Sequence, residues 1–492
     1  MNEYGQLDGV VVPMKSPNKP GEPGAEEMEG RTPTEGNEGQ GNRHQTQGWE
    51  SVKTKLQLIR EKARTDKGAK FTALLHHIYN INALRAAYFN LKEDAAAGID
   101  GETWKSYGEN LEVNLTDVSE RLKRGAYRAK PVRRVYIPKP DGRQRPLGVT
   151  ALEDKVVQRA TAEVLNAIYE VDFKGFSYGF RPGRNQHQAL DALYVAITTK
   201  KVNWILDADI RDFFGSINFE HLVKFIEKRI TDKRIVRLIQ KWLNAGVLES
   251  GELEYAERGA PQGSSISPLL ANVYLHYVYD QWIQEWRKKE AHGEVIVVRF
   301  ADDTIVGFQR QGDAEQFLTE LKERFLSFGL ELHPDKTRLL EFGRNAAESR
   351  KKRGEGKPET FTFLGFTHIC CEDRHGKFKV QRQTIGKRMR AKLDAIKVEL
   401  KGRINDTIKE VGTWLRRVVE GHYVYYAVPG NYPALSDFRH RVIQAWYRLL
   451  NRRSQRRSVT WEKMTLIATH WLPIPRIRHP YPDKRFYRLH PR

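Results

Sequence analysis

Two adjacent aspartates, Asp302 and Asp303, are the residues of this sequence whose type and position most directly indicate chemistry. They separate two β-branched runs, 295–300 and 304–308, which predict two strands joined by a hairpin with both carboxylates at its tip. Two like charges side by side repel each other unless a cation lies near them. Carboxylate oxygens favour magnesium or manganese, so the pair indicates a metal site. The alternative is a solvated acidic turn.

A second acidic strand is predicted at residues 204–210. Strand alternation places Leu206, Ala208 and Ile210 on one face, and Asp207, Asp209 and Arg211 on the other. Two strands that carry three carboxylates in all suit a two-metal phosphoryl-transfer site. In such a site one metal activates a 3′-hydroxyl and the other holds a triphosphate and stabilises the leaving oxygen.

Net charge points to the kind of partner. The chain of 492 residues carries +21, and residues 1–50 have a local balance of −5, which leaves +26 for the remainder. Such a surplus favours a polyanion, because each phosphate that is neutralised releases counterions. The alternatives are a generally solubilised surface or attraction to anionic lipid.

The elements that must position these acids follow from periodicity and composition. Residues 1–48 are rich in Gly, Pro and Glu and predict a disordered tail, whereas apolar spacings of three and four begin near Ser51. From Lys130 to Thr367 strands and helices interleave, and residues 344–358 are expected to form an exposed loop. After Gly386 the chain is helical and basic. Further strands are predicted at 132–137, 338–342 and 361–366, and helices at 153–169, 186–199, 219–230, 233–245, 268–287 and 313–328.

Cysteine usage and hydropathy bear on the compartment. Cys370 and Cys371 are the two cysteines and are neighbours, which makes them poor disulfide partners. No apolar run of about 18 residues and no signal-peptide pattern occurs, so we expect a cytoplasmic protein of the bacterial cytoplasm or nucleoid, with no membrane partner.

The acidic hairpin also carries a resemblance. Arg299-Phe300-Ala301-Asp302-Asp303 resembles the tyrosine-x-Asp-Asp signature of reverse transcriptases, and residues 130–367 follow the motif order of group II intron proteins. The resemblance implies that Asp209, Asp302 and Asp303 are catalytic. It implies two Mg²⁺ ions, which Mn²⁺ can replace, held by these aspartates and Ile210. Asp207 matches no role and is interpreted as support.

Several residues resemble the family's nucleotide site, each with a plainer alternative. Lys139 and Arg145 would clamp the triphosphate from a hairpin, or form a basic surface turn. Phe214 would exclude a 2′-hydroxyl, or be a core aromatic. Gln262 and Gly263 would approach template and nucleotide, or only open a helix with serine caps. Lys336 would protonate pyrophosphate, or balance charge.

Other segments resemble parts of the family that bind nucleic acid. Leu364 and Gly365 are similar to the primer grip, and otherwise read as a buried strand. Residues 177–184 resemble an insertion of group II intron and related enzymes, and residues 98–101 are similar to their N-terminal extension. Residues 421–431 resemble the maturase domain, where aromatics beside bases would stack on RNA, or form a plain helical core. Arg452, Arg453, Arg456 and Arg457 are predicted to contact phosphates, or to form a solvated helix face.

Two departures from the family pattern stand out. Phe300 replaces the usual tyrosine, which removes a hydroxyl but keeps the ring, so we expect activity to survive. No cysteine pairs follow the maturase-like region, so the zinc-associated DNA endonuclease of some relatives is expected to be absent.

The resemblance implies a mixed α+β right-hand polymerase, with an antiparallel palm sheet and an all-helical thumb. The expected divisions are a disordered tail (1–48), an N-terminal extension (49–130), fingers and palm (131–370), a thumb or maturase domain (371–450) and a basic tail (451–492). The expected function is RNA-directed DNA synthesis on an RNA template and DNA primer with deoxynucleoside triphosphates. Group II intron RNA and target DNA are the expected partners. The rivals are an RNA-binding splicing cofactor without polymerase activity and a free-standing enzyme of defence or repair.

Overall fold

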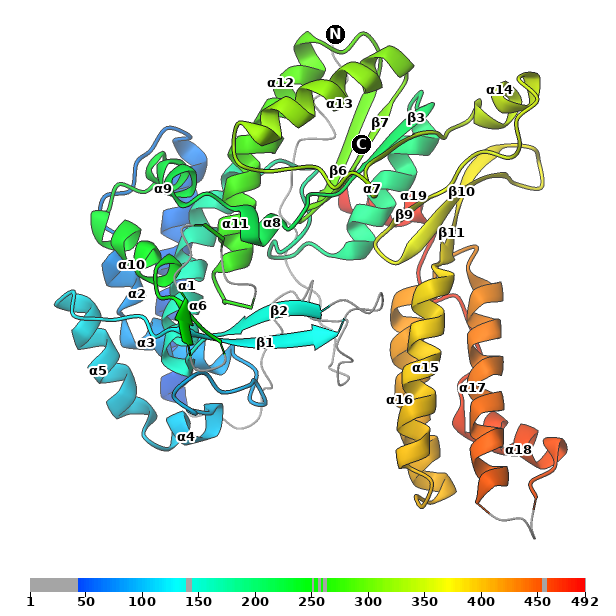
Figure 1. The fold of residues 1–492 in the computed structure, drawn as a ribbon. Coiled ribbons are helices and arrows are strands. Elements are labelled where there is room, and N and C mark those ends of the chain that lie inside the picture. Colours follow the sequence, from blue (N-terminus) through cyan, green and yellow to red (C-terminus); the bar gives the residue numbers. More distant parts are fainter. Residues whose placement is uncertain are drawn as a thin grey trace.

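The computed structural model describes residues 43–138, 144–249, 252–254, 258–259, 263–453 and 458–491. Figure 1 shows an N-terminal lobe of helices, a central sheet and a bundle of long C-terminal helices. The fold is therefore mixed α/β, with antiparallel sheets and a helical C-terminal region, as the sequence predicts. None of the helices in the described ranges is both long enough and apolar enough to span a bilayer.

Helices dominate the N-terminal lobe. Three of them pack against one another: α1 (Arg43–Thr65), α3 (Ile81–Phe89) and α6 (Leu152–Asp172). The first begins at Arg43, within the tail predicted for residues 1–48, so helical structure starts before the apolar spacing near Ser51. The shorter helices of the lobe are α2 (Leu75–Ile78), α4 (Trp104–Glu109), α5 (Leu111–Lys123), α9 (Phe219–Glu227) and α10 (Lys233–Leu243).

A small sheet lies at the edge of this lobe, with the strand order β2-β1-β4-β5. Its strands are β1 (Val132–Pro138), β2 (Gln144–Val149), β4 (Val247–Glu249) and β5 (Glu252–Glu254). The first two form the antiparallel hairpin expected for this segment, whereas β4 runs parallel to β1. Their connection, residues 139–143, lies outside the described ranges.

The central sheet has the order β6-β7-β3-β8, and all its neighbouring strands are antiparallel. Its strands are β3 (Trp204–Ala208), β6 (Val295–Phe300), β7 (Asp303–Phe308) and β8 (Arg338–Glu341). All six residues of β6 are buried, because helices cover both faces. One face packs with α7 (Gln186–Thr199), and the other with α11 (Ser267–Leu275) and α13 (Gln311–Leu326).

One helix was predicted at residues 268–287, and residues 267–289 are helical throughout but not regular. A π-helical segment, η3 (His276–Asp280), lies between α11 and α12 (Gln281–Lys289). This wider turn changes which side chains share a face of the helix.

Two predictions for the segment after β8 were wrong in detail. Residues 344–358 were expected to form an exposed loop, but they contain the helix α14 (Ala346–Lys352). The single strand predicted at 361–366 is divided into β9 (Phe361–Phe363) and β10 (Phe366–Glu372), which form a three-stranded sheet with β11 (Phe378–Thr384).

The C-terminal region is a bundle of α15 (Gly386–Gly402), α16 (Ile408–Tyr426), α17 (Tyr432–Arg452) and α18 (Trp461–Trp471). It has its own core, centred on Leu415, Tyr423 and Trp446. The last helix, α19 (Pro482–Leu489), leaves the bundle and packs against α7 beside the central sheet.

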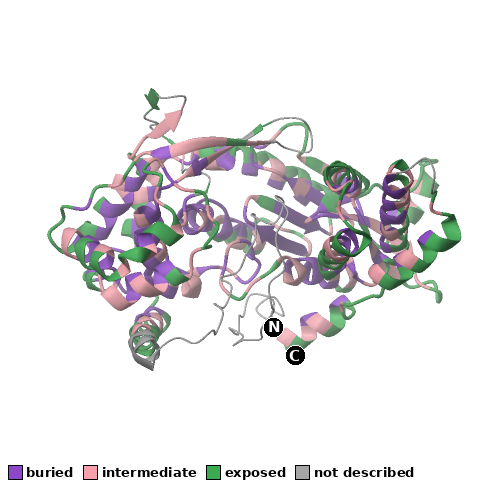
Figure 2. Cartoon of the chain, turned by 90° about the horizontal axis from the view of Figure 1, so that it is seen from below, coloured by how far each residue is buried: buried purple, intermediate pink, exposed green. Residues whose placement is uncertain are grey.

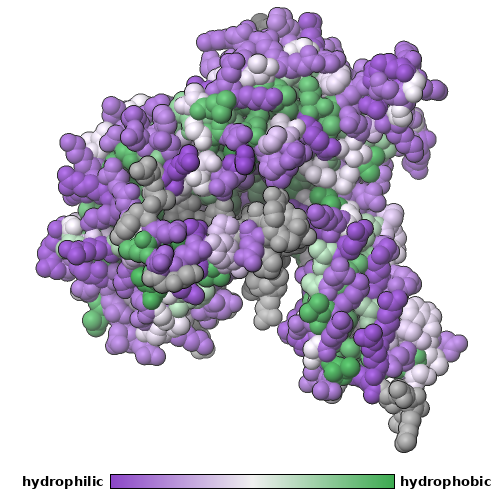
Figure 3. All heavy atoms as spheres, in the orientation of Figure 1, coloured by the Kyte–Doolittle hydropathy of each residue, from purple (hydrophilic) through white to green (hydrophobic). Residues whose placement is uncertain are grey.

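Burial follows this arrangement. Figure 2 shows buried residues concentrated in the lobe and around the sheet, with exposed residues along the outer sides of the C-terminal helices. Figure 3 shows a largely hydrophilic face, in which the C-terminal bundle stands away from the N-terminal lobe across a hollow.

Candidate nucleotidyl-transfer site

The three aspartates predicted to be catalytic lie at one end of the central sheet. Strands β3 and β7 pair with Ala208 opposite Thr304. Asp209 follows Ala208 and Asp303 precedes Thr304, so the two aspartates lie at the same end of this strand pair. Asp302 is next to Asp303 in the β6–β7 turn. The sheet thus brings together two acidic segments that lie far apart in the sequence.

The hairpin tip is a tight connection. Phe300 pairs with Asp303, so Ala301 and Asp302 alone form the turn. Ala301 has φ +57°, a left-handed conformation that is unfavourable for a residue with a Cβ and costs about 1–3 kcal/mol. Asp302 is half-buried and Asp303 is exposed. Strain of this kind persists only where the surroundings hold the backbone in place.

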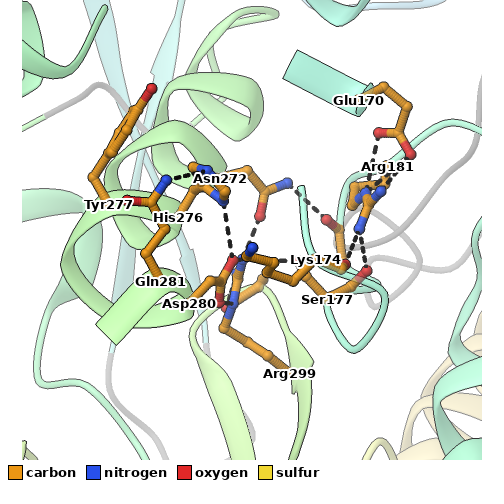
Figure 4. Close-up of polar contacts among 12 residues, drawn as sticks. Glu170, Lys174, Ser177, Arg181, Asn272, His276, Tyr277, Asp280, Gln281 and Arg299 are labelled. Atoms are coloured by element: carbon orange, nitrogen blue, oxygen red, sulfur yellow. Dashed lines mark hydrogen bonds and ion pairs between the residues drawn. The ribbon is translucent and has the colours of Figure 1, made fainter. Parts of the chain in front are cut away.

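The surroundings include a buried arginine that sequence reasoning did not single out. Arg299 is 1% exposed and forms a two-point ion pair with Asp280, at 2.7 and 2.6 Å (Figure 4). The signal available in the sequence was the arginine itself, since a buried arginine in an apolar strand needs a carboxylate partner. Asp280, in the middle of a helical segment, gave no sign of being that partner.

The Asp209 segment is fixed by main-chain bonds on its other side. The amide of His333 donates to the carbonyl of Asp209, and the amide of Arg211 donates to that of Glu331, at 2.8 Å each. Successive residues of an extended segment direct their carbonyls to opposite sides. The carbonyl of Ile210 therefore faces away from residues 331–333, on the side where β7 and the hairpin tip lie.

Lys336 forms an ion pair with Asp209. Its Nζ lies 2.6 Å from Oδ2 of Asp209, and the lysine itself is half exposed. The contact joins residues 127 positions apart in the chain. In this arrangement Lys336 balances the charge of Asp209, which is the plainer of its two predicted roles.

Asp207 lies in a different environment from Asp209. Its carboxylate is 3.9 Å from the guanidinium of Arg338. Burial raises the pKa of Asp207 to about 7, an effect that Arg338 partly opposes and that Asp209 reinforces. Asp207 therefore lies beside the acidic end of the sheet with a cationic neighbour of its own, Arg338.

The donor set fits Mg²⁺ or Mn²⁺ by its chemistry. Three carboxylates and a main-chain carbonyl are hard oxygen ligands, which these ions prefer. In the ranges that the structure describes, no three His, Cys, Asp or Glu side chains already converge as in a preformed metal cage. In the described residues the three acids therefore share one end of the sheet without forming a metal cage.

Phe214 follows the acidic strand on a short helix, α8 (Phe213–Ser216). Phe213 is 3% exposed and belongs to the core, whereas Phe214 is half-buried and meets it edge-on at 5.4 Å. The buried aromatic of the pair is thus Phe213, and Phe214 keeps part of its ring accessible.

Gly263 makes a close approach that requires glycine. It has φ +105°, and a Cβ there would come within 2.8 Å of the carbonyl of Gly148 on β2. The two segments predicted to surround the nucleotide are thus in contact. Lys139 and Gln262 lie outside the described residues, and Arg145 is placed only by its backbone in β2, opposite Ile137.

The segment predicted as the primer grip is a two-residue turn between β9 and β10. Leu364 has φ +45° and Gly365 has φ +84°, with Phe363 paired to Phe366. Positive φ at both central residues is typical of a type I′ hairpin. The hydroxyl of Tyr425 donates to the carbonyl of Leu364 at 2.7 Å, so the turn is attached to α16.

The residues predicted to act in the C-terminal region differ in burial. His422 and Tyr423 are buried in the bundle, so for these two residues the plain helical core is the correct reading. Arg452, at the end of α17, is exposed, whereas Arg453 is half-buried and donates to the carbonyl of Arg403 at 3.2 Å. Arg456 and Arg457 lie outside the described residues.

Comparison with known proteins gives a family match. The model of the family described as "Reverse transcriptase (RNA-dependent DNA polymerase)" matches residues 137–368, a segment that contains all three aspartates. The Escherichia coli protein YkfC is 31% identical over 354 residues, which cover 65% of this chain and 88% of that protein.

Two further relatives carry descriptive names. The group II intron-encoded protein LtrA of Lactococcus lactis is 33% identical over 235 residues, 48% of this chain and 39% of that protein. The mitochondrial nuclear intron maturase 3 of Arabidopsis thaliana is 31% identical over 140 residues, 28% of this chain and 19% of that protein. The match to these two relatives covers less than half of their lengths.

Proposed function

Because the chain belongs to the group II intron-type reverse transcriptases and maturases, we propose that it extends a DNA primer on an RNA template with deoxynucleoside triphosphates. The observation that carries this proposal is the register of the central sheet. It pairs Ala208, which precedes Asp209, with Thr304, which follows Asp303, and the ammonium of Lys336 lies 2.6 Å from Asp209.

In this proposal the regions take the roles of a right hand. The N-terminal lobe with the β1–β2 hairpin acts as fingers, the central sheet as palm, and the bundle α15–α18 as thumb. Asp209, Asp302, Asp303 and the carbonyl of Ile210 would hold two Mg²⁺ ions, which activate the primer 3′-hydroxyl and stabilise charge on the triphosphate.

The remaining residues bind and orient the substrates. Lys139 and Arg145 hold the triphosphate from the β1–β2 hairpin. Phe214, whose ring is partly accessible, lies under the sugar and excludes a 2′-hydroxyl. Gln262 and Gly263 line the template side, where Gly263 meets Gly148. The Leu364-Gly365 turn supports the primer end and is itself held by Tyr425.

A second role is to bind a group II intron RNA and assist its splicing and mobility. It is supported by the charge of the chain, +21 overall, and by the names of the relatives. Arg452, Arg456 and Arg457 are the proposed phosphate contacts of the C-terminal region, whereas Arg453 is bonded to the carbonyl of Arg403.

Primer extension tests the first role. The wild-type chain, an RNA template, a DNA primer and the four deoxynucleotides with Mg²⁺ should give full-length DNA. An Asp209→Asn variant should give none and should still bind intron RNA in a filter or gel-shift assay. If the wild-type protein makes no DNA with Mg²⁺ or Mn²⁺ but binds intron RNA tightly, it is a splicing cofactor instead.

A further inference from the structure

We propose that Arg299 is a positioning residue for the polymerase site and sets the place of the Asp302-Asp303 tip through its buried ion pair with Asp280. The inference deepens the proposed function and rests on it. Arg299 is the last residue but one of β6 and is therefore close in sequence to the hairpin turn.

The ion pair is fully enclosed and geometrically specific. Nε of Arg299 donates to Oδ1 of Asp280 at 2.7 Å, and Nη2 donates to Oδ2 at 2.6 Å. The two side chains are 1% and 0% exposed. A two-point contact between a planar guanidinium and a carboxylate fixes orientation as well as distance. The ion pair thereby fixes strand β6 to the π-helical segment η3, which follows α11.

The same guanidinium also contacts the tip. Nη1 of Arg299 donates to the carbonyl of Ala301, two residues further along the chain, at 2.8 Å. Ala301 is the residue with φ +57°, so this bond holds the strained position of the hairpin. Because Asp302 and Asp303 follow Ala301 directly, a shift of the Ala301 peptide moves both carboxylates.

A third segment, residues 176–179, packs against the hairpin tip. The amide of Tyr178 donates to the carbonyl of Arg299, and the amide of Arg299 donates to that of Phe176. Next along this segment, a Cβ at Gly179 would come within 2.2 Å of the Ala301 nitrogen. Figure 4 shows Ser177 and Asn272 directed at the same guanidinium, to which they are bonded at 2.7 and 3.1 Å.

The π-helical turn explains how Asn272 and Asp280 reach the same arginine. They are eight residues apart, which in a regular α-helix separates side chains by roughly 80° around the axis. The segment His276–Asp280 is π-helical, and its wider turns remove much of this rotation. Single π turns recur at functional sites, and here the turn serves the pair with Arg299.

A contribution to folding stability alone does not explain the buried pair of Arg299 and Asp280. A buried ion pair gains little over apolar side chains of the same volume, because both charges lose their hydration. Metal ligands, in contrast, must be held to about 0.5 Å, and an error of 1 Å can cost about 100-fold in rate. The five donor bonds of Arg299 are all directed at groups that fix the turn or its supports.

Arg299→Met tests the proposal, because methionine keeps the volume and removes every donor. We expect the Mg²⁺ concentration for half-maximal primer extension to rise at least about tenfold. Mn²⁺ binding to the protein alone, followed by electron paramagnetic resonance, should weaken by a similar factor, with Asp302→Asn as the reference for loss of the site. Arg299→Lys keeps the charge without the planar fork and should fall between wild type and methionine.

Arg229→Met is the matched control. Arg229 is 4% exposed, pairs with Asp172 at 3.0 Å and donates to main-chain carbonyls, but it lies in the N-terminal lobe. Its loss should lower the melting temperature as much as that of Arg299 while leaving the Mg²⁺ midpoint and the Mn²⁺ affinity unchanged. A third variant, Ser177→Ala, removes one bond of 2.7 Å and serves if Arg299→Met does not fold; we expect a two- to fivefold shift of the midpoint.

The outcomes separate the two proposals. Equal Mn²⁺ affinity and Mg²⁺ midpoint in wild type and Arg299→Met, or in wild type and Ser177→Ala where the methionine variant is unfolded, overturn the positioning role. Weakened Mn²⁺ binding in Arg299→Met, together with no DNA synthesis by the wild-type chain under any condition, leaves the positioning role standing and overturns the polymerase.

Discussion

The β6–β7 hairpin and the C-terminal segment 458–491 both carry charge that the sequence marks as functional, and the structure uses the two charges differently. At the hairpin, the buried pair of Arg299 and Asp280 supports two carboxylates that reach the protein surface. In the C-terminal segment, Arg485 turns inward and pairs with Asp191, which is 1% exposed and also contacts Arg382 at 3.2 Å.

The same holds for other arginines near the C-terminus. Residues 438–492 contain fourteen Lys or Arg against two acids, which predicts a strongly cationic surface. Yet Arg439 donates to the carbonyls of Pro473, Ala468 and Leu472 and so attaches the end of α18 to α17. Arginine has five N–H donors. It can therefore connect main-chain carbonyls of two segments as readily as it binds phosphate.

The comparison teaches when a charged motif can be interpreted from sequence. Carboxylates at the junction of two apolar strands must lie at the tip of the hairpin that joins the strands. Their exposure is therefore predictable. An arginine on an amphipathic helix can bend back along its long stem, and its partner is set by tertiary contacts. Charge counts therefore overstate the binding surface of the C-terminal region.

Asp302→Asn should produce the largest effect. Loss of a metal-binding carboxylate at the tip should lower DNA synthesis about 10³-fold or more, because it removes several kcal/mol of stabilisation from the transition state. Intron-RNA binding should stay close to that of the wild type. Single-nucleotide extension under saturating Mg²⁺ measures the rate.

Asp373→Asn provides the control for that experiment. Asp373 lies in the turn between β10 and β11, where it accepts the amides of His375 and Lys377 at 2.8 and 3.0 Å. It is thus a hairpin aspartate with a purely local role, and its variant should synthesise DNA at the normal rate. Near wild-type synthesis by Asp302→Asn would remove the hairpin from the active site.

Asp191→Asn should have the next largest effect, on stability rather than on chemistry. It leaves two guanidiniums without their carboxylate, and Arg382 is 1% exposed, so unfolding should become easier by about 3–5 kcal/mol. Urea titration measures the loss. DNA synthesis at a temperature where the variant is folded should stay within about threefold of wild type.

An exposed aspartate pair gives the reference value. Asp437 and Arg441 form an i,i+4 ion pair on α17 at 2.9 Å, with the carboxylate 40% exposed. Asp437→Asn should change stability by less than about 0.5 kcal/mol. Should Asp191→Asn stop synthesis as Asp302→Asn does, the division between a chemical and a structural use of charge would break down.

The strands that carry the acids were predictable because their signal is local. Strand β6 was expected at 295–300 and lies at Val295–Phe300, since four successive apolar residues, Val295 to Val298, favour a strand. The helix α14 was missed because Lys351, Lys352 and nearby glycines outweighed the good helix formers Ala346, Ala347 and Glu348.

The supports of the site could not be predicted in the same way. Arg485 and Asp191 are 294 residues apart, and no periodicity in the chain connects them. Likewise, the pairing of Arg299 with Asp280 depends on a π-helical turn that propensities do not reveal. Sequence patterns indicate which residues carry chemistry, whereas the contacts that aim them come from tertiary packing.

Phe214→Val should have an intermediate effect. A smaller side chain leaves room for a 2′-hydroxyl, so the preference for deoxyribonucleotides over ribonucleotides should fall about 10- to 100-fold in kcat/KM. Phe213→Leu, at the buried neighbour, should instead lower stability and leave the preference unchanged. An unaltered preference in Phe214→Val would make that ring part of the core packing only.

The smallest expected effect separates two adjacent arginines at the end of α17. Arg452 is exposed, whereas Arg453 is half-buried and bonded to the carbonyl of Arg403. If Arg452 contacts a phosphate, Arg452→Ala should reduce the slope of log affinity against log salt by about 0.9 on duplex DNA, or about 0.7 on single strands. Arg453→Ala should leave the slope nearly unchanged and lower the melting temperature instead. Binding isotherms at four or more salt concentrations measure both slopes. Equal slope changes in the two variants would show that the intramolecular bond of Arg453 gives way to nucleic acid, and the C-terminal arginines would then act as the sequence alone predicts.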